Sequence, residues 1–309
     1  MIVTVTLNPS LDRTLSVPEL RPGNLHRARL LREDLGGKGI NVSRSLQRLG
    51  IASRIMGCAG GWTGRALREG LQAQGFEVSF VDVDAEIRQN ITLLDEARGL
   101  YTKINEQGPA LGSRQAEALE EQVRESVRPG DLWALCGSLP PGAEPDLYAR
   151  LIQCVQAGKG RAFLDASGDP LRVGAAAGPF ALKVNAEEAA ELLGRPLPAE
   201  AEVVKAAGEL QAQGIHLVVL TRGAQGLVLA MDGRRVIAVP PPVPARSSVG
   251  AGDATLAGLL WAVSEGCDPE TTARRAAACG TAAAMQEGTG VGEAALVNQL
   301  LAEVEISAA

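Results

Sequence analysis

The chain has 309 residues, 46% of them hydrophobic and 21% charged, and carries a formal net charge of −6. This length can bury a large core in one or two domains, and the negative charge argues against nucleic acid or a membrane surface as a partner. No apolar run reaches membrane-spanning length, the start has no signal-peptide pattern, and five scattered cysteines form no C-x-x-C pair. We therefore expect a cytoplasmic protein with free thiols.

The first strand is expected at residues 2–7, and Asn8-Pro9-Ser10 ends it. Asp12 follows directly after this strand. Ligands of open α/β sheets bind at such strand ends, although an isolated Asp after Asn-Pro is more often an ordinary turn residue.

A glycine-rich loop, Gly36-Gly37-Lys38-Gly39, leads into a helix expected at about residues 40–49. Three glycines and a lysine at a helix start are typical of an anion site, and equally of a flexible loop. The chain lacks the G-x-x-x-x-G-K-[ST] spacing of a P-loop here, and it lacks the G-x-G-x-x-G pattern that an NAD-dependent enzyme would carry after the first strand.

Residues 52–83 predict a strand, a helix and a strand, and residues 87–94 and 100–105 then predict a hairpin. This hairpin interrupts an otherwise alternating β/α order. We therefore expect it to lie in a small sheet outside the main one, as a lid. The lid strands are placed in two insertions, at about residues 11–34 and 86–108.

The remainder of the chain continues as strands and helices. We expect strands at 131–136, 161–165, 181–185 and 215–221, a hairpin at 227–239, helices at 113–127, 146–157, 187–193 and 200–213, and three closing helices. The order predicts a single domain over residues 1–309. Its fold class is α/β, a three-layer α/β/α sandwich around a mostly parallel sheet.

Residues 248–255 form a turn of small residues that runs into an apolar helix. Gly250 and Gly252 allow the backbone to approach a ligand, and the helix start adds free N–H groups and the positive end of the helix dipole. Asp253 lies in the first turn. Such a site can hold a phosphoryl group while the carboxylate accepts a proton from an attacking hydroxyl, or Asp253 is simply the N-cap.

Seven segments form a specific combination along the chain. Such a combination is far beyond what chance explains for a single glycine motif. They are TLNPSLD (6–12), GGKGINVSR (36–44), TKINEQGP (102–109), GSLPPG (137–142), KVNAEE (183–188), TRGAQG (221–226) and VGAGDA (249–254). Together they resemble the PfkB (ribokinase-like) carbohydrate kinases, and within them the branch of 1-phosphofructokinases and tagatose-6-phosphate kinases.

The resemblance implies phosphoryl transfer with Asp253 as the catalytic base. It implies an anion hole built from Gly250, Ala251 and Gly252. It also implies a substrate-binding set that contacts the sugar hydroxyls or the phosphate already on the sugar: Asp12, Gly37, Lys38, Asn41, Arg88, Asn90, Lys103 and Ser138.

For the nucleotide, the resemblance implies a binding set of Lys183, Asn185, Thr221, Gly223 and Gly226. Asn185 and Glu188 resemble the N-x-x-E motif that acts on Mg²⁺, largely through water, and Mg²⁺ commonly keeps several waters. The expected cofactors are therefore ATP and Mg²⁺.

Three positions depart from the family pattern. Thr92 replaces the lysine of R-x-N-V-K, Arg222 replaces a small or apolar residue, and the loop at 287–291 lacks a clear asparagine. The first departure affects the choice between sugars that carry a 1-phosphate and sugars that carry a 6-phosphate.

The expected activity is phosphorylation of fructose 1-phosphate on its 6-hydroxyl to give fructose 1,6-bisphosphate. Tagatose 6-phosphate and fructose 6-phosphate, phosphorylated on the 1-hydroxyl, are alternatives, and a non-catalytic sugar-phosphate sensor is another. Apolar residues on the lid strands (Ile91, Leu93, Leu100 and Ile104) favour a homodimer through the lid sheet.

Overall fold

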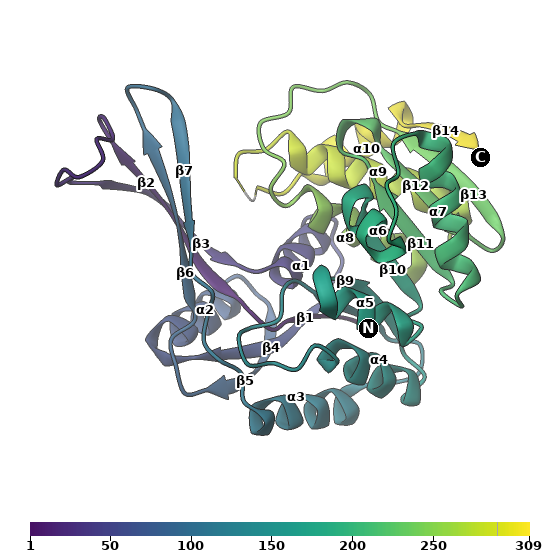
Figure 1. The fold of residues 1–309 in the computed structure, drawn as a ribbon, viewed down its shortest axis with the longest axis horizontal. Coiled ribbons are helices and arrows are strands. Elements are labelled where there is room, and N and C mark those ends of the chain that lie inside the picture. Colours follow the sequence, from purple (N-terminus) through teal and green to yellow (C-terminus); the bar gives the residue numbers. More distant parts are fainter. Residues whose placement is uncertain (289) are drawn as a thin grey trace.

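The computed structural model describes residues 1–288 and 290–309, so one residue of the loop at 287–291, Thr289, lies outside the described residues. Within this part of the chain, ten strands form a large sheet and four form a small one (Figure 1). The large sheet has the strand order β14-β13-β12-β11-β10-β9-β8-β1-β4-β5, and the small sheet has the order β3-β2-β6-β7.

The large sheet is mostly parallel, as expected. Its strands are β1 (Ile2–Thr6), β4 (Arg54–Gly60), β5 (Glu77–Val83), β8 (Leu132–Cys136), β9 (Arg161–Asp165), β10 (Ala181–Asn185), β11 (Leu217–Thr221), β12 (Leu227–Met231), β13 (Arg234–Val239) and β14 (Glu305–Ala308). Neighbours from β5 to β11 run parallel. β12, β13 and β14 add to one edge in antiparallel fashion.

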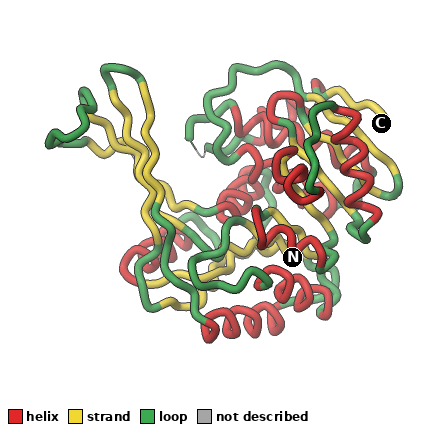
Figure 2. Tube along the Cα trace, viewed as in Figure 1, coloured by secondary structure: helices red, strands yellow, loops and turns green. Residues whose placement is uncertain are grey.

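Helices cover both faces of this sheet (Figure 2). One face carries α3 (Ser113–Ser126), α4 (Leu147–Ala157), α5 (Gly168–Ala176), α6 (Ala186–Leu193) and α7 (Glu200–Ala212). The other carries α1 (Lys38–Arg48), α2 (Gly61–Ala73), α8 (Ala251–Ser264), α9 (Pro269–Ala284) and α10 (Ala294–Glu303). This arrangement confirms the three-layer α/β/α sandwich. In the described part of the chain, none of the helices has the length and apolar character needed to cross a membrane.

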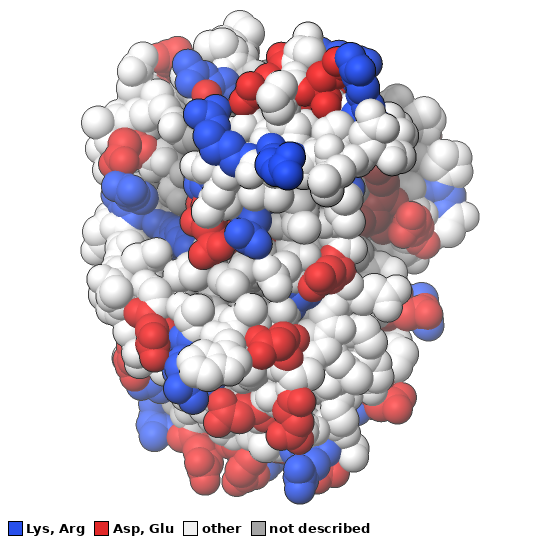
Figure 3. All heavy atoms as spheres, turned by 90° about the vertical axis from the view of Figure 1, so that its left-hand side faces the viewer, with Lys and Arg blue, Asp and Glu red and all other residues white. Residues whose placement is uncertain are grey.

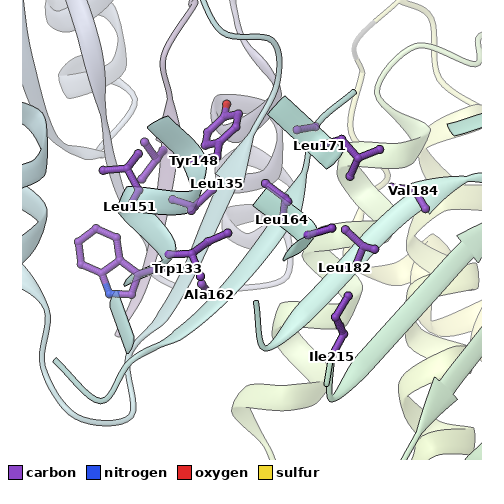
Figure 4. Close-up of a cluster of buried hydrophobic side chains, with 14 of the residues drawn as sticks. Trp133, Leu135, Tyr148, Leu151, Ala162, Leu164, Leu171, Leu182, Val184 and Ile215 are labelled. Atoms are coloured by element: carbon purple, nitrogen blue, oxygen red, sulfur yellow. The ribbon is translucent and has the colours of Figure 1, made fainter. Parts of the chain in front are cut away.

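The central strands are apolar because both of their faces are buried. In β8, Trp133 and Leu135 pack under α3 and α4, whereas Leu132 and Ala134 pack against the opposite layer. Figure 4 shows the first of these clusters, in which Tyr148 of α4 lies beside the β8 side chains. The Tyr148 hydroxyl lies 3.0 Å from the carbonyl oxygens of both Cys136 and Gly137. The core is thereby tied to the turn that follows β8.

The small sheet projects from the main body (Figure 1). It consists of β2 (Ser10–Val17), β3 (Arg29–Gly36), β6 (Arg88–Asp95) and β7 (Leu100–Asn105), in agreement with the small sheet expected from the hairpin. β2 pairs with β6 in parallel, and this register places Asp12 opposite Asn90.

Two elements were not expected from the sequence. Helix α5 starts with Gly-Asp-Pro, which resembles a turn, but proline is tolerated in a first helical turn and Leu171 and Ala175 are buried in the core. The short strand β14 forms only because it pairs with the open edge of β13. Both elements depend on contacts with distant parts of the chain.

We expect Tyr148→Phe to lower the free energy of unfolding by about 1–2 kcal/mol, because one buried and one part-buried carbonyl group lose their shared donor while the ring stays packed. Urea denaturation measures this loss. Tyr101→Phe, on a tyrosine that is 63% exposed, is the matched control and should change stability by less than about 0.5 kcal/mol. Equal effects of the two substitutions would contradict the role of the hydroxyl.

Candidate active site

The candidate site lies at the carboxyl edge of the parallel strands, beside the junction of β1 and β8. From β1 the chain first builds the sheet outward through β4 and β5, and then returns to build it in the other direction from β8. Such a reversal of strand order is where ligands bind in open α/β sheets. A cavity of about 180 Å³ is found there, lined by Thr6, Asn8, Lys38, Arg88, Cys136, Gly137, Ser138, Ala166 and Ser167.

Asp253 is buried in the first turn of α8, next to the start of α1. Gly250 precedes the helix in the left-handed region, with a φ of 82°, which glycine adopts without strain. Asn41 Nδ2 donates a hydrogen bond of 2.8 Å to Asp253 Oδ2. Burial, together with the negative charge of Asp165, raises the pKa of Asp253 from 3.8 to about 6. A carboxylate with such a pKa is suited to accept a proton near neutral pH.

A second buried carboxylate, Asp165 at the end of β9, joins two lysines. Its Oδ1 accepts a hydrogen bond from Lys38 Nζ and its Oδ2 accepts one from Lys183 Nζ, each at 2.9 Å. Burial opposes the charge on Asp165, but the two lysines hold its pKa below the usual value. Likewise, burial opposes the charge on Lys38, but Asp165 and Asp253 raise the pKa of that ammonium.

Lys183 also reaches the start of α8. A Cβ atom on Gly252 would lie only 2.8 Å from Lys183 Nζ, so the glycine leaves room for this ammonium. The first turn of α8 therefore combines free backbone N–H groups with a buried cation, and this combination attracts an anion.

Asp12 lies where the small sheet meets the main body. Its Oδ1 accepts hydrogen bonds from Ser10 Oγ at 2.8 Å and from Asn90 Nδ2 at 2.7 Å. Gly37 precedes α1 with a φ of 136°, and a Cβ atom there would lie 2.7 Å from Thr6 Cγ2. Asp12, Asn90 and Gly37 thus gather beside the cavity.

The cations expected to hold a phosphate fall into two groups. Lys38 and Arg88 line the cavity together with Ser138, and Arg88 Nε donates to the Asn8 carbonyl at 3.2 Å. Lys103 is exposed on the outer strand β7, opposite Thr92 of β6, and is not part of the cavity lining. The structure therefore does not bring Lys103 together with the other three.

The residues expected to contact a nucleotide lie at the ends of β10 and β11. Asn185 and Glu188 form a capping box at the start of α6: Asn185 Oδ1 accepts from the Glu188 N–H at 2.8 Å, and Glu188 Oε2 accepts from the Asn185 N–H at 2.9 Å. Thr221 ends β11, and the chain then turns through Gly223 and Gly226. A Cβ atom on Gly226 would collide with the Ala238 carbonyl oxygen.

Arg222, one of the departures from the family pattern, packs against the turn after β11. Its guanidinium pairs with Glu200 at 2.7 Å and donates to the Gln225 carbonyl at 2.9 Å, and only 7% of the side chain is exposed. Arg222 thus stabilises the turn after β11.

Comparison with known proteins identifies the family. A model of the pfkB family carbohydrate kinases matches residues 5–295. The chain belongs to this family. It is therefore a phosphotransferase that acts on a sugar hydroxyl, and PfkB kinases use ATP as the phosphoryl donor.

Individual PfkB relatives support a sugar-phosphate kinase. The chain is 34% identical to a 1-phosphofructokinase of Bacillus subtilis over 99% of both chains. It is 35% identical to the ATP-dependent 6-phosphofructokinase isozyme 2 of Escherichia coli over 93% of this chain and 94% of that protein. The crystal structure of phosphofructokinase-2 from Escherichia coli in complex with substrates and products superposes with a TM-score of 0.91 at 32% identity, covering 97% and 98% of the two chains.

Sequence reasoning missed four residues of the candidate site. Asp165 follows an apolar strand, the same signal that singled out Asp12, and could have been found in this way. Ser167 precedes α5, a helix that the sequence did not reveal. Thr6 Oγ1 and Asn8 Oδ1 are buried without a hydrogen-bond partner among the described residues, and both side chains line the cavity. Both lie in the TLNPSLD segment (6–12) that carries the family resemblance, and that segment is the signal that could have found them.

The raised pKa of Asp253 implies that the free energy of unfolding depends on pH. Because this carboxyl binds its proton more tightly in the folded than in the unfolded chain, its ionisation costs stability as the pH rises through about 6. We expect Asp253→Asn to raise the free energy of unfolding by about 1–3 kcal/mol at pH 8, with little gain at pH 4. Urea denaturation at the two pH values tests this. The exposed Asp84→Asn is the control, and a gain that did not depend on pH would contradict the prediction.

Proposed function

We propose that this PfkB kinase phosphorylates fructose 1-phosphate on its 6-hydroxyl, with MgATP as the donor, to give fructose 1,6-bisphosphate. The observation that carries the proposal is a buried carboxylate, Asp253, at a glycine-rich helix start beside a cavity lined by Lys38, Arg88 and Ser138. The names of the relatives favour this sugar, since several that are 30–36% identical are called 1-phosphofructokinase.

In this proposal the sugar lies between the small sheet and the start of α8. Its hydroxyls contact Asp12, Asn90 and Asn41, and Gly37 allows the ring to approach the backbone. The phosphate already on the sugar is held by Arg88 and Lys38, with Ser138 as a hydrogen-bond donor. Guanidinium and ammonium groups in a confined cavity supply the positive charge that the chain as a whole lacks.

The nucleotide side is proposed at the ends of β10 and β11, with Thr221, Gly223 and Gly226 at the phosphates and ribose. Lys183 and Asn185 face the phosphate chain, and Glu188 holds Mg²⁺ through water. The donor set fits such a site, because Glu188 keeps one carboxylate oxygen outside its capping box and Mg²⁺ needs few protein ligands when phosphates and waters supply the others. Bound Mg²⁺ would neutralise charge on the phosphates during transfer.

Catalysis then depends on Asp253. Its carboxylate accepts the proton of the 6-hydroxyl as the oxygen attacks, and the N–H groups of Gly250, Ala251 and Gly252 face the oxygens of the moving phosphoryl group. Phosphoryl transfer needs mainly positioning and charge stabilisation, and the site is built from groups that provide both.

A second candidate substrate is a 6-phosphorylated ketohexose. The Escherichia coli relative at 35% identity is called a 6-phosphofructokinase, and Thr92 replaces a lysine expected in the 1-phosphofructokinase pattern. In either type of sugar, one free primary hydroxyl would lie at Asp253 and the phosphate at the other end of the sugar would lie at Lys38 and Arg88.

The substrate is tested by kcat/KM for fructose 1-phosphate, fructose 6-phosphate and tagatose 6-phosphate under identical MgATP. We expect a preference of about 100-fold for fructose 1-phosphate, about 2.7 kcal/mol of transition-state discrimination. Asp253→Asn is the control for catalysis and should bind nucleotide while losing at least about 100-fold in kcat. Preference for a 6-phosphate would make the second candidate correct, and nucleotide binding without any turnover would favour a sensor.

We also propose a homodimer through the small sheet. Five large apolar side chains on its strands, Leu30, Leu31, Leu100, Tyr101 and Ile104, are between 43% and 63% exposed. Figure 3 shows the side from which the small sheet projects, where broad uncharged areas separate groups of charged side chains. A second copy would cover these side chains and the open strand edges.

Light scattering tests the dimer. We expect twice the chain mass of 32.1 kDa at micromolar concentration, and a single chain mass for the double variant Leu100→Asp/Ile104→Asp. Trp62→Asp, at an apolar residue of α2 that is 78% exposed, is the matched control and should leave the mass unchanged. A wild-type mass of one chain would refute the proposal.

A further inference from the structure

Asp165 is the most deeply buried charged group of the site, and no described role uses it. Its side chain has no exposed surface, and both of its oxygens accept hydrogen bonds from lysines of different elements. Lys38 comes from the first turn of α1, and Lys183 comes from β10. One carboxylate thus holds three elements together at the carboxyl edge of the sheet.

The two lysines face different parts of the site. Lys183 Nζ lies against Gly252 in the first turn of α8, where the proposed function puts the moving phosphoryl group. Lys38 lines the cavity with Arg88 and Ser138, where the phosphate already on the sugar would lie. Asp165 therefore lies between two lysines, and each lysine is near the expected position of one phosphate.

We propose that Asp165 is a positioning residue that fixes Lys38 and Lys183 in the conformations that contact the two phosphates of the reaction. The inference rests on the proposed function. A lysine is a point charge on a flexible stem, and it loses considerable rotamer freedom when it is ordered. A buried carboxylate that accepts from both ammonium groups provides that order before either substrate binds, which is the general advantage of a preorganised charge.

Asp165 also acts on the catalytic base. Burial is the largest cause of the raised pKa of Asp253, and the negative charge of Asp165 is the next. Lys38, the Asn41 hydrogen bond and Lys183 lower that pKa. Neutralising Asp165 removes a like charge, so the pKa of Asp253 should fall and the acidic limb of the kcat/KM profile, which reports the free enzyme, should move to lower pH.

The first test is Asp165→Asn in the full-length protein, assayed with MgATP and the best sugar phosphate. An amide has one acceptor oxygen in place of two, so one lysine loses its partner and its fixed position. We expect kcat/KM to fall about 100-fold, the scale of a small misplacement of a reacting group, and the acidic limb of the kcat/KM profile to move below pH 6.

Asp131→Asn is the matched control. Asp131 is also buried and ion-paired, with the N-terminal ammonium at 2.8 Å, but it precedes β8 at the opposite edge of the sheet. The Asp131→Asn variant should lose stability while it keeps the wild-type kcat/KM and the wild-type pH of its acidic limb. If Asp165→Asn behaved as Asp131→Asn does, with neither kinetic change, the positioning role would be wrong.

The lysines keep the inference testable even if Asp165→Asn does not fold. Lys38→Met should mainly raise KM for the sugar phosphate, whereas Lys183→Met should mainly lower kcat. Wild-type kinetics in both variants would overturn the inference. A wild-type protein without transfer to any of the three sugars would instead refute the proposed function, so the two failures are distinguishable.

Discussion

Burial of two carboxylates and one lysine at one edge of the sheet, beside a second lysine whose side chain is 41% exposed, is the constraint on which the site depends. Charges leave water only at a high cost unless they are paired, and here Asp165 and Asp253 share their surroundings with Lys38 and Lys183. The compensation is uneven. Asp165 has an ammonium on each oxygen, whereas the hydrogen bond described for Asp253 comes from the neutral amide of Asn41. Consequently Asp165 keeps its charge easily, and Asp253 binds a proton more readily.

The difference between the two carboxylates suits two separate tasks. A permanently charged group can hold cations in place, and a group whose pKa lies near 6 can exchange a proton at physiological pH. The fold places both carboxylates at the site. Asp165 ends β9 in the large sheet, and Asp253 lies in the first turn of α8, in a helix layer that covers this sheet. Gly252 leaves the room that Lys183 needs to reach the start of the helix.

The small sheet is linked to this charged edge through short connections. β2 begins only a few residues after β1 ends, so Asn8 and Asp12 lie at the boundary between the two sheets. Arg88, the first residue of β6, donates to the Asn8 carbonyl across that boundary. A movement of the small sheet would therefore shift the groups proposed to contact the sugar. Farther out on the small sheet, Thr92 of β6 lies opposite Lys103 of β7.

The sequence by itself determined the α/β architecture, the small sheet, the glycine-rich helix start with Asp253, and the family, because these depend on local periodicity and contiguous motifs. Only the tertiary structure decided what depends on residues far apart in the chain. Lys38 and Asp165 are separated by 127 positions, and their pairing needs α1 and β9 to meet. Helix α5 forms because Leu171 enters the core, despite a start that resembles a turn. Lys103 and Ser138 belong to neighbouring motifs, yet Ser138 lines the cavity and Lys103 does not. Burial and charge pairing arise when distant segments pack, and no local pattern encodes them.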